Sequence, residues 1–81
     1  MKERRLCPCC GYLSLNSELS DYEICPICFW ENDLVQQMDP TYTGGANVVC
    51  LREARENYRK YGVSEKRFKH FVREPKKEEF P

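Results

Sequence analysis

The pattern of apolar and polar residues predicts two short strands in the first third of the chain. Residues 12–15 (YLSL) and residues 22–24 (YEI) have the alternating or aromatic character that is typical of strands. Residues 16–21, which lie between these two runs, are mostly turn-forming. Residues 11–24 therefore predict a β-hairpin.

No regular pattern follows in residues 31–50. This segment contains Asp39-Pro40 and Gly44-Gly45, pairs that mark turns, so we expect a loop. A loop of this length is uncommon in a compact domain, so it either packs over the core or carries function. Its acidic side chains do not have the spacing of a calcium loop, and we expect them to be solvated: Glu31, Asp33 and Asp39.

Helical periodicity begins after residue 50. Over residues 51–61 the apolar residues recur at helical spacing and form one face: Leu51, Ala54, Tyr58 and Tyr61. Gly62 is a natural C-terminal stop for this helix. A second short helix is predicted from an N-cap at Ser64 to the segment before Pro75, with a buried stripe of Phe68, Phe71 and Val72. Residues 76–81 are expected to be a frayed tail.

The chain is short and polar. Its 81 residues predict a single domain, residues 1–81, of which 41% are hydrophobic and 32% charged. A chain of this size buries little apolar surface, so we expect a metal or disulfides to stabilise it. The predicted parts are a knuckle hairpin, a loop, a helical part and a tail: 1–30, 31–50, 51–75 and 76–81.

Six cysteines are candidates for that stabilisation. Disulfide frameworks are typical of secreted proteins, but the chain starts MKERR and shows no apolar segment of a signal peptide. No stretch is long and apolar enough to span a membrane. We therefore expect a cytoplasmic protein whose paired cysteines bind metal.

Two Cys-Pro-x-Cys knuckles predict the metal site. Cys7 and Cys10 are separated from Cys25 and Cys28 by 14 residues, a spacing typical of four-cysteine metal sites. Four thiolates at about 2.3 Å make a closed tetrahedral site, with zinc as the first candidate and iron as the alternative. Redox-active dithiols are disfavoured because the chain has no βαβ pattern. Phe29-Trp30 are expected to cover the metal and build the core.

Two further cysteines, Cys9 and Cys50, fall outside this set. Cys9 occupies the position that Ile27 fills in the second knuckle, so its side chain is expected to point away from the metal. Cys50 precedes the first predicted helix, and we expect it to pack there as a structural residue. As an alternative, either one is a redox-active thiol, since a nearby metal or a helix N-terminus lowers a thiol pKa. A catalytic pair of Cys50 and His70 is disfavoured because the two lie on different predicted helices.

Charge is unevenly spread along a chain of formal net charge zero. Residues 1–49 carry three basic and seven acidic groups, whereas residues 50–81 carry ten basic and six acidic groups. The C-terminal part is thus the candidate for contact with an anionic partner. Glutamates at ion-pair spacing nevertheless favour a solvated helix face over a nucleic-acid site for Arg52, Arg55 and Arg59.

The sequence resembles the bacterial cysteine-rich CPCC domain family. The motifs are CPCCGY at residues 7–12 and YEICPICFWEND at residues 22–33, and the similarity continues through GGAN, LREARENYRKYG and SEKRFKHFVREP. The knuckles are also similar to those of zinc ribbons and, more distantly, of rubredoxins, whose cysteine pairs are separated by a longer insert. The resemblance implies a small metal-binding protein and supplies no catalytic mechanism. Family members tend to have serine at the position of Cys50, which argues against a family-wide role for this thiol.

These observations predict a small α+β fold. A zinc-ribbon-like β-hairpin with two cysteine knuckles is followed by two short C-terminal helices, which pack Tyr58, Tyr61, Phe68 and Phe71 against the hairpin. A closed metal site has no open position for a substrate or water, so we expect a binding module and not an enzyme. A protein is the first candidate partner and a nucleic acid the second. The alternatives are a rubredoxin-like iron electron carrier and a thiol redox sensor that uses Cys9 or Cys50.

Overall fold

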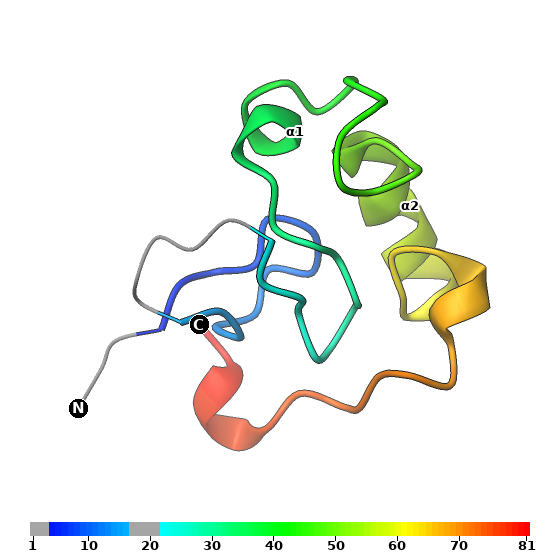
Figure 1. Ribbon diagram of the computed structural model, residues 1–81. Coiled ribbons are helices and arrows are strands. Elements are labelled where there is room, and N and C mark those ends of the chain that lie inside the picture. Colours follow the sequence, from blue (N-terminus) through cyan, green and yellow to red (C-terminus); the bar gives the residue numbers. More distant parts are fainter. Residues whose placement is uncertain (1–3, 17–21) are drawn as a thin grey trace.

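The computed structural model describes residues 4–16 and 22–81, and it contains short helices joined by long connections (Figure 1). Two are α-helices, and two are short 3₁₀ helices: α1 (Leu34–Met38), α2 (Leu51–Tyr61), η1 (Lys66–Phe68) and η2 (Lys77–Glu79). Over the described ranges, none of these helices has the length and apolar composition of a membrane span.

The predicted β-hairpin is not supported. Residues 12–15 and 22–24 do not pair with each other; each run forms one antiparallel bridge across its own knuckle, Arg5 with Leu15 and Ile24 with Glu31. The reason is that each knuckle already reverses the chain, so the nearest antiparallel partner of each run is the other flank of that knuckle. Part of the expected turn, residues 17–21, lies outside the described residues.

The segment expected to be a loop contains α1, and Asp33 organises its start. One carboxylate oxygen of Asp33 accepts a hydrogen bond from the Val35 N–H at 2.9 Å, as an N-cap does. The other oxygen accepts from the Ala46 N–H at 2.8 Å. Asp33 is therefore buried, and the expectation of a solvated side chain is wrong for this residue.

Gln36 holds the rest of this segment together. Its fully buried amide nitrogen donates to three backbone carbonyls, those of Tyr42, Asn47 and Val49, at 3.2–3.3 Å. Its amide oxygen accepts from the backbone and side-chain nitrogens of Asn47 at 3.1 and 3.0 Å. Gly45 lies so close that a Cβ there would meet the Gln36 side chain at 2.7 Å. Residues 31–50 are thus a packed part of the fold, arranged around one polar side chain.

The predicted helix over residues 51–61 is confirmed as α2. Cys50 stands at its N-cap with an extended backbone and makes no side-chain capping bond, and Gly62 ends it in the left-handed conformation with φ +78°. Leu51 and Ala54 are fully buried on the inner face. Tyr58 also packs against the core, whereas Tyr61 is 40% exposed, so the packed face of α2 ends at Tyr58.

The predicted second helix is wrong. The segment after Gly62 forms only the three-residue η1, and Ser64 is not its N-cap. Instead, the Ser64 N–H donates to the carbonyl of Cys28, and the Arg73 N–H donates to the carbonyl of Pro26. The backbone of this segment therefore bonds to the second knuckle at both ends, and between these bonds it forms η1 and turns in place of a longer helix. Phe71, expected in a buried stripe, is 66% exposed.

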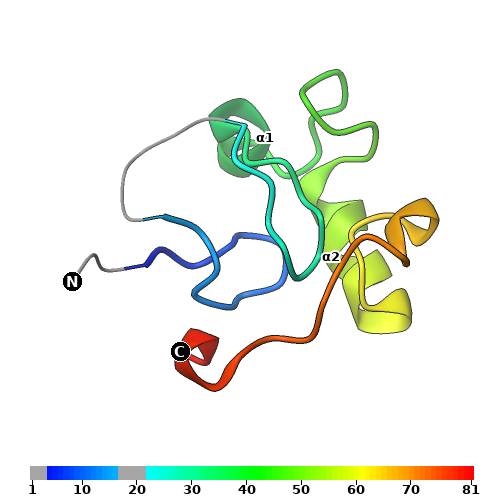
Figure 2. The ribbon, with the colours of Figure 1, turned by 60° about the horizontal axis from the view of Figure 1, so that its bottom comes forward.

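The predicted frayed tail is wrong as well. Glu79 in η2 is almost fully buried, and both of its carboxylate oxygens accept hydrogen bonds from the Arg73 guanidinium at 2.8 Å. The Leu13 N–H donates to the carbonyl of Glu79 at 2.7 Å. Both ribbon views show the red C-terminal segment returning to the blue N-terminal part of the chain (Figures 1 and 2).

Candidate metal centre

The two cysteine knuckles have the same backbone geometry. In the first, the Gly11 N–H donates to the carbonyl of Cys7 at 2.9 Å, and in the second the Phe29 N–H donates to the carbonyl of Cys25 at 2.8 Å. A second hydrogen bond of 2.9 Å joins the residues on either side of each turn: the Cys7 N–H donates to the carbonyl of Tyr12, and the Cys25 N–H donates to the carbonyl of Trp30. The repeated Cys-Pro-x-Cys sequence thus corresponds to a repeated local structure.

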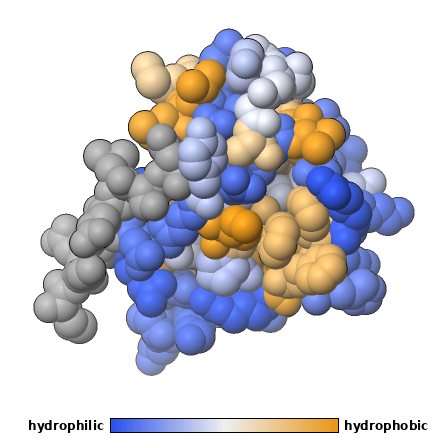
Figure 3. All heavy atoms as spheres, viewed as in Figure 1, coloured by the Kyte–Doolittle hydropathy of each residue, from blue (hydrophilic) through white to orange (hydrophobic). Residues whose placement is uncertain are grey.

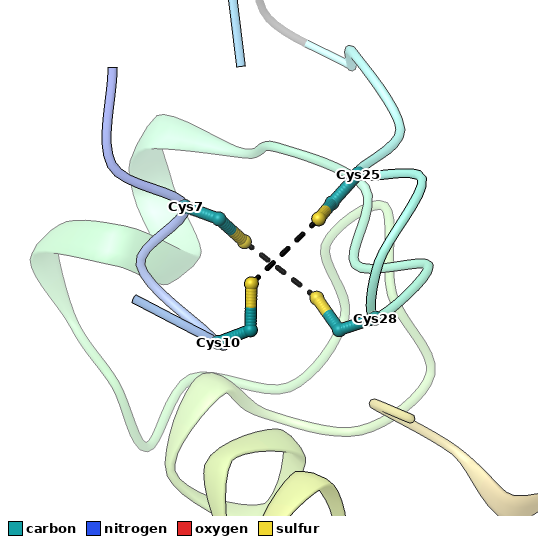
Figure 4. A group of neighbouring side chains, drawn as sticks. All are labelled: Cys7, Cys10, Cys25 and Cys28. Atoms are coloured by element: carbon teal, nitrogen blue, oxygen red, sulfur yellow. Dashed lines mark hydrogen bonds between the residues drawn. The ribbon is translucent and has the colours of Figure 1, made fainter. Parts of the chain in front are cut away.

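The knuckles bring four cysteine sulfurs together. Those of Cys7, Cys10, Cys25 and Cys28 all lie within 4.8 Å of one another. Figure 4 shows the four side chains pointing from the two knuckles toward one centre. Across this centre, the Sγ atoms of Cys7 and Cys28 are 3.6 Å apart and those of Cys10 and Cys25 are 3.8 Å apart (Figure 4). All four cysteines are free thiols, without a disulfide.

This spacing fits a metal ion. Four ligands placed tetrahedrally at about 2.3 Å from a metal lie about 3.8 Å from one another. The two sulfur–sulfur distances of 3.6 and 3.8 Å agree with that value. Thiolates are the ligands of tetrahedral zinc and iron sites, so the donor set fits either metal.

The site is closed to solvent on most sides. Cys7, Cys25 and Cys28 are at most 1% exposed, and Cys10 is half-buried. Trp30 is fully buried in the same core, as expected, whereas Phe29 is only half-buried. Little room is therefore left for a water or a substrate beside the four sulfurs.

Hydrogen bonds distinguish Cys25 from the other three thiols. Its Sγ atom lies 3.0 Å from the Ser14 hydroxyl and accepts the Ile27 N–H at 3.3 Å. Hydrogen bonding to the neighbouring thiols, chiefly Cys10, lowers the pKa of Cys25. Hydrogen bonding within the cluster, again chiefly to Cys10, raises the pKa of Cys28. The sulfurs thus compete for protons, and a cation at their centre would favour the thiolate form of all four.

The C-terminal half of the chain supports both knuckles. Three hydrogen bonds reach knuckle carbonyls: Arg55 Nε to Pro8 O at 2.8 Å, Ser64 N to Cys28 O at 2.7 Å, and Arg73 N to Pro26 O at 3.1 Å. Arg55 lies on an exposed face, as expected, and its guanidinium also donates a hydrogen bond to the first knuckle. No pattern in the sequence indicated these contacts, because each joins residues far apart in the chain.

The two remaining cysteines lie outside the cluster. Cys9 is buried in the same core as the four sulfurs, but its own sulfur is not part of their group. Cys50 is at the start of α2, and His70 follows η1, which lies by the other end of α2 (Figures 1 and 2). The structure therefore does not bring Cys50 and His70 together.

The comparison with known families agrees with the geometry. The sequence model of the family described as "Cysteine-rich CPCC" matches residues 5–79, a range that includes both knuckles, α2 and η2. No curated protein matches the chain. With four clustered cysteines and a match over nearly its whole length, the chain belongs to the cysteine-rich CPCC family.

Proposed function

We propose that this protein binds one structural zinc ion through Cys7, Cys10, Cys25 and Cys28, and that the metal-stabilised fold acts as a binding module. The observation that carries this proposal is the spacing of 3.6–3.8 Å between opposed sulfurs in a closed site. Zinc is proposed because closed tetrahedral thiolate sites are typical of structural zinc.

The composition of the core supports a structural role for the metal. Among the described residues, four of its nine buried members are cysteines, and the large apolar side chains are Leu15, Ile27, Trp30 and Leu51. Such a small core supplies little stability by itself, so metal binding contributes directly to folding. The metal centre would join the two knuckles, which are also linked by hydrogen bonds from the Asn16 N–H to the Glu23 carboxylate.

A binding role, and not catalysis, is proposed because the site is closed. A catalytic zinc keeps one position open for water or substrate, whereas a four-cysteine site fills all positions with protein sulfurs. The metal would then contribute to binding indirectly, because it fixes the positions of the segments that pack around the knuckles.

The experiment begins with elemental analysis of the purified chain. We expect one zinc per chain and a colourless protein, and we expect Cys28→Ser to lose the metal. Cys50→Ser is the matched control, since Cys50 lies outside the cluster, and it should keep one zinc. One iron per chain with thiolate-to-iron absorption bands would instead support the electron carrier.

Removal of the metal tests its structural role. A strong chelator should abolish the cooperative thermal transition of the wild-type chain and collapse the dispersion of its amide NMR signals, because metal binding and folding are coupled. An apo protein that keeps its fold and its thermal stability would show that the metal has no structural role.

A further inference from the structure

Three phenylalanine rings meet at the surface beside the second knuckle. The ring centroid of Phe29 lies 4.4 Å from that of Phe68 and 5.7 Å from that of Phe71. Phe71 is 66% exposed, so one ring of this phenylalanine cluster is open to solvent. Figure 3 shows orange side chains gathered in the lower right of the face and bordered by blue, hydrophilic ones.

The backbone of Phe29 suggests that this ring has a role beyond the knuckle. Phe29 has φ +67° and occupies the position that Gly11, with φ +81°, fills in the first knuckle. A left-handed conformation is unfavourable for a bulky side chain and free of cost for glycine. Such strain, where it is found, points to a function for the residue that bears it.

Basic residues flank Phe68 and Phe71 along the chain. Within residues 65–74 (EKRFKHFVRE), the two acids flank the basic residues, and Glu65 is paired with Arg67 at 2.8 Å. Lys66 lies 5.5 Å from the ring centroid of Tyr61. In the described part of the chain, Lys66 and Lys69 form no ion pair, so both remain available to an anion.

A cleft of about 460 Å³ adjoins this charged segment. Tyr58 and Tyr61 of α2 line one side, Ile27 and Val72 supply apolar contacts, and Lys69 lines the cleft as well. This volume is within the range of about 300–1,000 Å³ that is typical of small-molecule sites, so a single planar ring system fits. Glu74 also lines the cleft and would repel an anion there. An anionic group of the ligand would therefore lie by Lys66 and Lys69.

We propose that this surface binds single-stranded nucleic acid. One base stacks on the exposed ring of Phe71, a neighbouring base enters the cleft against Tyr58 and Tyr61, and the phosphates lie along Lys66 and Lys69. Proteins that bind single strands combine aromatic stacking with a basic path for the backbone. An acidic peptide would pair with the lysines, but its residues do not each carry a flat ring, as nucleotides do, that stacks on the aromatic side chains. The inference rests on the proposed metal-stabilised fold, because the second knuckle positions Phe29.

The test measures the fluorescence anisotropy of a labelled 12-nucleotide mixed-sequence single strand, as DNA and as RNA, against the full chain loaded with zinc. We expect saturable binding at 50 mM salt, weaker binding to the same sequence as a duplex, and no competition by a poly-glutamate peptide. Phe71→Ala should weaken binding roughly tenfold, the loss expected for one stacked base. Zinc content is checked on every sample first.

Charge variants test the phosphate contacts. The double variant Lys66→Ala/Lys69→Ala should flatten the dependence of log K on log salt by about 1.4, or roughly 0.7 for each phosphate contact of a single strand. Arg52→Ala/Lys60→Ala is the control of equal charge, since both residues line a separate hollow with Cys50 and Glu53, and it should leave the slope nearly unchanged.

Three outcomes would overturn the inference: no saturable binding by chain that holds one zinc, equal binding of duplex and single strand, or capture of poly-glutamate that depends on Phe71 and the two lysines. None of these outcomes contradicts the zinc proposal. That proposal fails only if the chain holds no zinc or folds without it. Amide chemical shifts of the wild-type chain provide a check that needs no variant. The nucleic acid should perturb the amide signals of residues 58–73 and leave those of α1 unchanged.

Discussion

Gly11 and Phe29 occupy the same position in the two knuckles, and both have a positive φ, +81° and +67°. Gly11 is free of backbone strain, whereas Phe29 combines a left-handed backbone with a ring that packs on Phe68. Two opposing contributions to stability therefore meet at Phe29, and substitutions can separate them.

Phe29→Gly should be more stable than Phe29→Ala by about 1 kcal/mol. Both variants lose the ring contacts, but only glycine regains the freedom of the left-handed conformation, which costs an alanine about 1–2 kcal/mol. Urea denaturation of the zinc-loaded variants measures the difference. An alanine variant as stable as the glycine variant would mean that the positive φ imposes no strain.

Ser14→Ala should weaken zinc binding by about tenfold or more. The Ser14 hydroxyl lies 3.0 Å from the Cys25 sulfur, and loss of such an outer hydrogen bond typically reduces metal affinity by about 10–100-fold. Competition with a chromophoric chelator gives the affinity. Ser64→Ala is the matched control, because Ser64 is equally buried and its hydroxyl has no hydrogen-bond partner in the described chain. Equal affinities for the two variants would contradict a role for Ser14 at the site.

Gln36→Ala should destabilise the protein by about 2–4 kcal/mol. The change removes all the hydrogen bonds of a buried amide and leaves the carbonyls of Tyr42 and Val49 without this donor. Gln37→Ala, one residue along the same helix and exposed, should change stability by less than about 0.5 kcal/mol. Thermal denaturation at fixed zinc concentration compares the two, and a similar effect of both substitutions would refute the assigned role of Gln36.

The pair of Arg73 and Glu79 should make stability depend on pH below about 4.5. The pKa of Glu79 is lowered from 4.5 to about 2, and the main cause is its hydrogen bonding to Arg73. Because the folded-state pKa is the lower one, this stabilisation is complete above pH 4.5 and is lost as the pH falls toward 2. We expect a contribution of about 1–2 kcal/mol at neutral pH, since Arg73 is 38% exposed and water screens the pair.

The variant Glu79→Gln isolates this contribution. The zinc site also loses its ligands in acid, so the quantity to measure is the difference in unfolding free energy between wild type and variant at pH 6 and at pH 3.5. That difference should shrink at the lower pH. Glu78→Gln, at an exposed neighbour, should show little difference at either pH. A constant difference for Glu79→Gln would contradict the lowered pKa.

Local signals in the sequence were sufficient for the two knuckles and for α2. The spacing of the four cysteines indicated which sulfurs come together, since a knuckle is defined within a few residues. The helix over residues 51–61 was likewise predicted from its apolar spacing and from Gly62. Nearly everything that joins distant segments was missed, because a hydrogen bond such as Ser64 N–H to Cys28 O has no periodic signature.

The errors have the same physical origin. Ser64 and Phe68 have the pattern of a helix start, but bonds from the backbone to the second knuckle prevail over that local preference. Residues 76–81 were expected to form a frayed tail because terminal segments are often poorly ordered, and only the fold brings Arg73 to Glu79. Gln36 gave no signal because a buried amide cannot be recognised from residue type alone.

The hydrogen bonds from Arg55, Ser64 and Arg73 to knuckle carbonyls have a consequence for the order of folding. All four clustered cysteines precede Arg55, Ser64 and Arg73 in the chain, so the ribosome makes the sulfurs before the donors to the knuckle carbonyls. A growing chain can therefore gather zinc early, but its knuckles acquire their final surroundings only after residue 73 has emerged. Exchange of the metal should be fast on the nascent chain and slow on the finished protein.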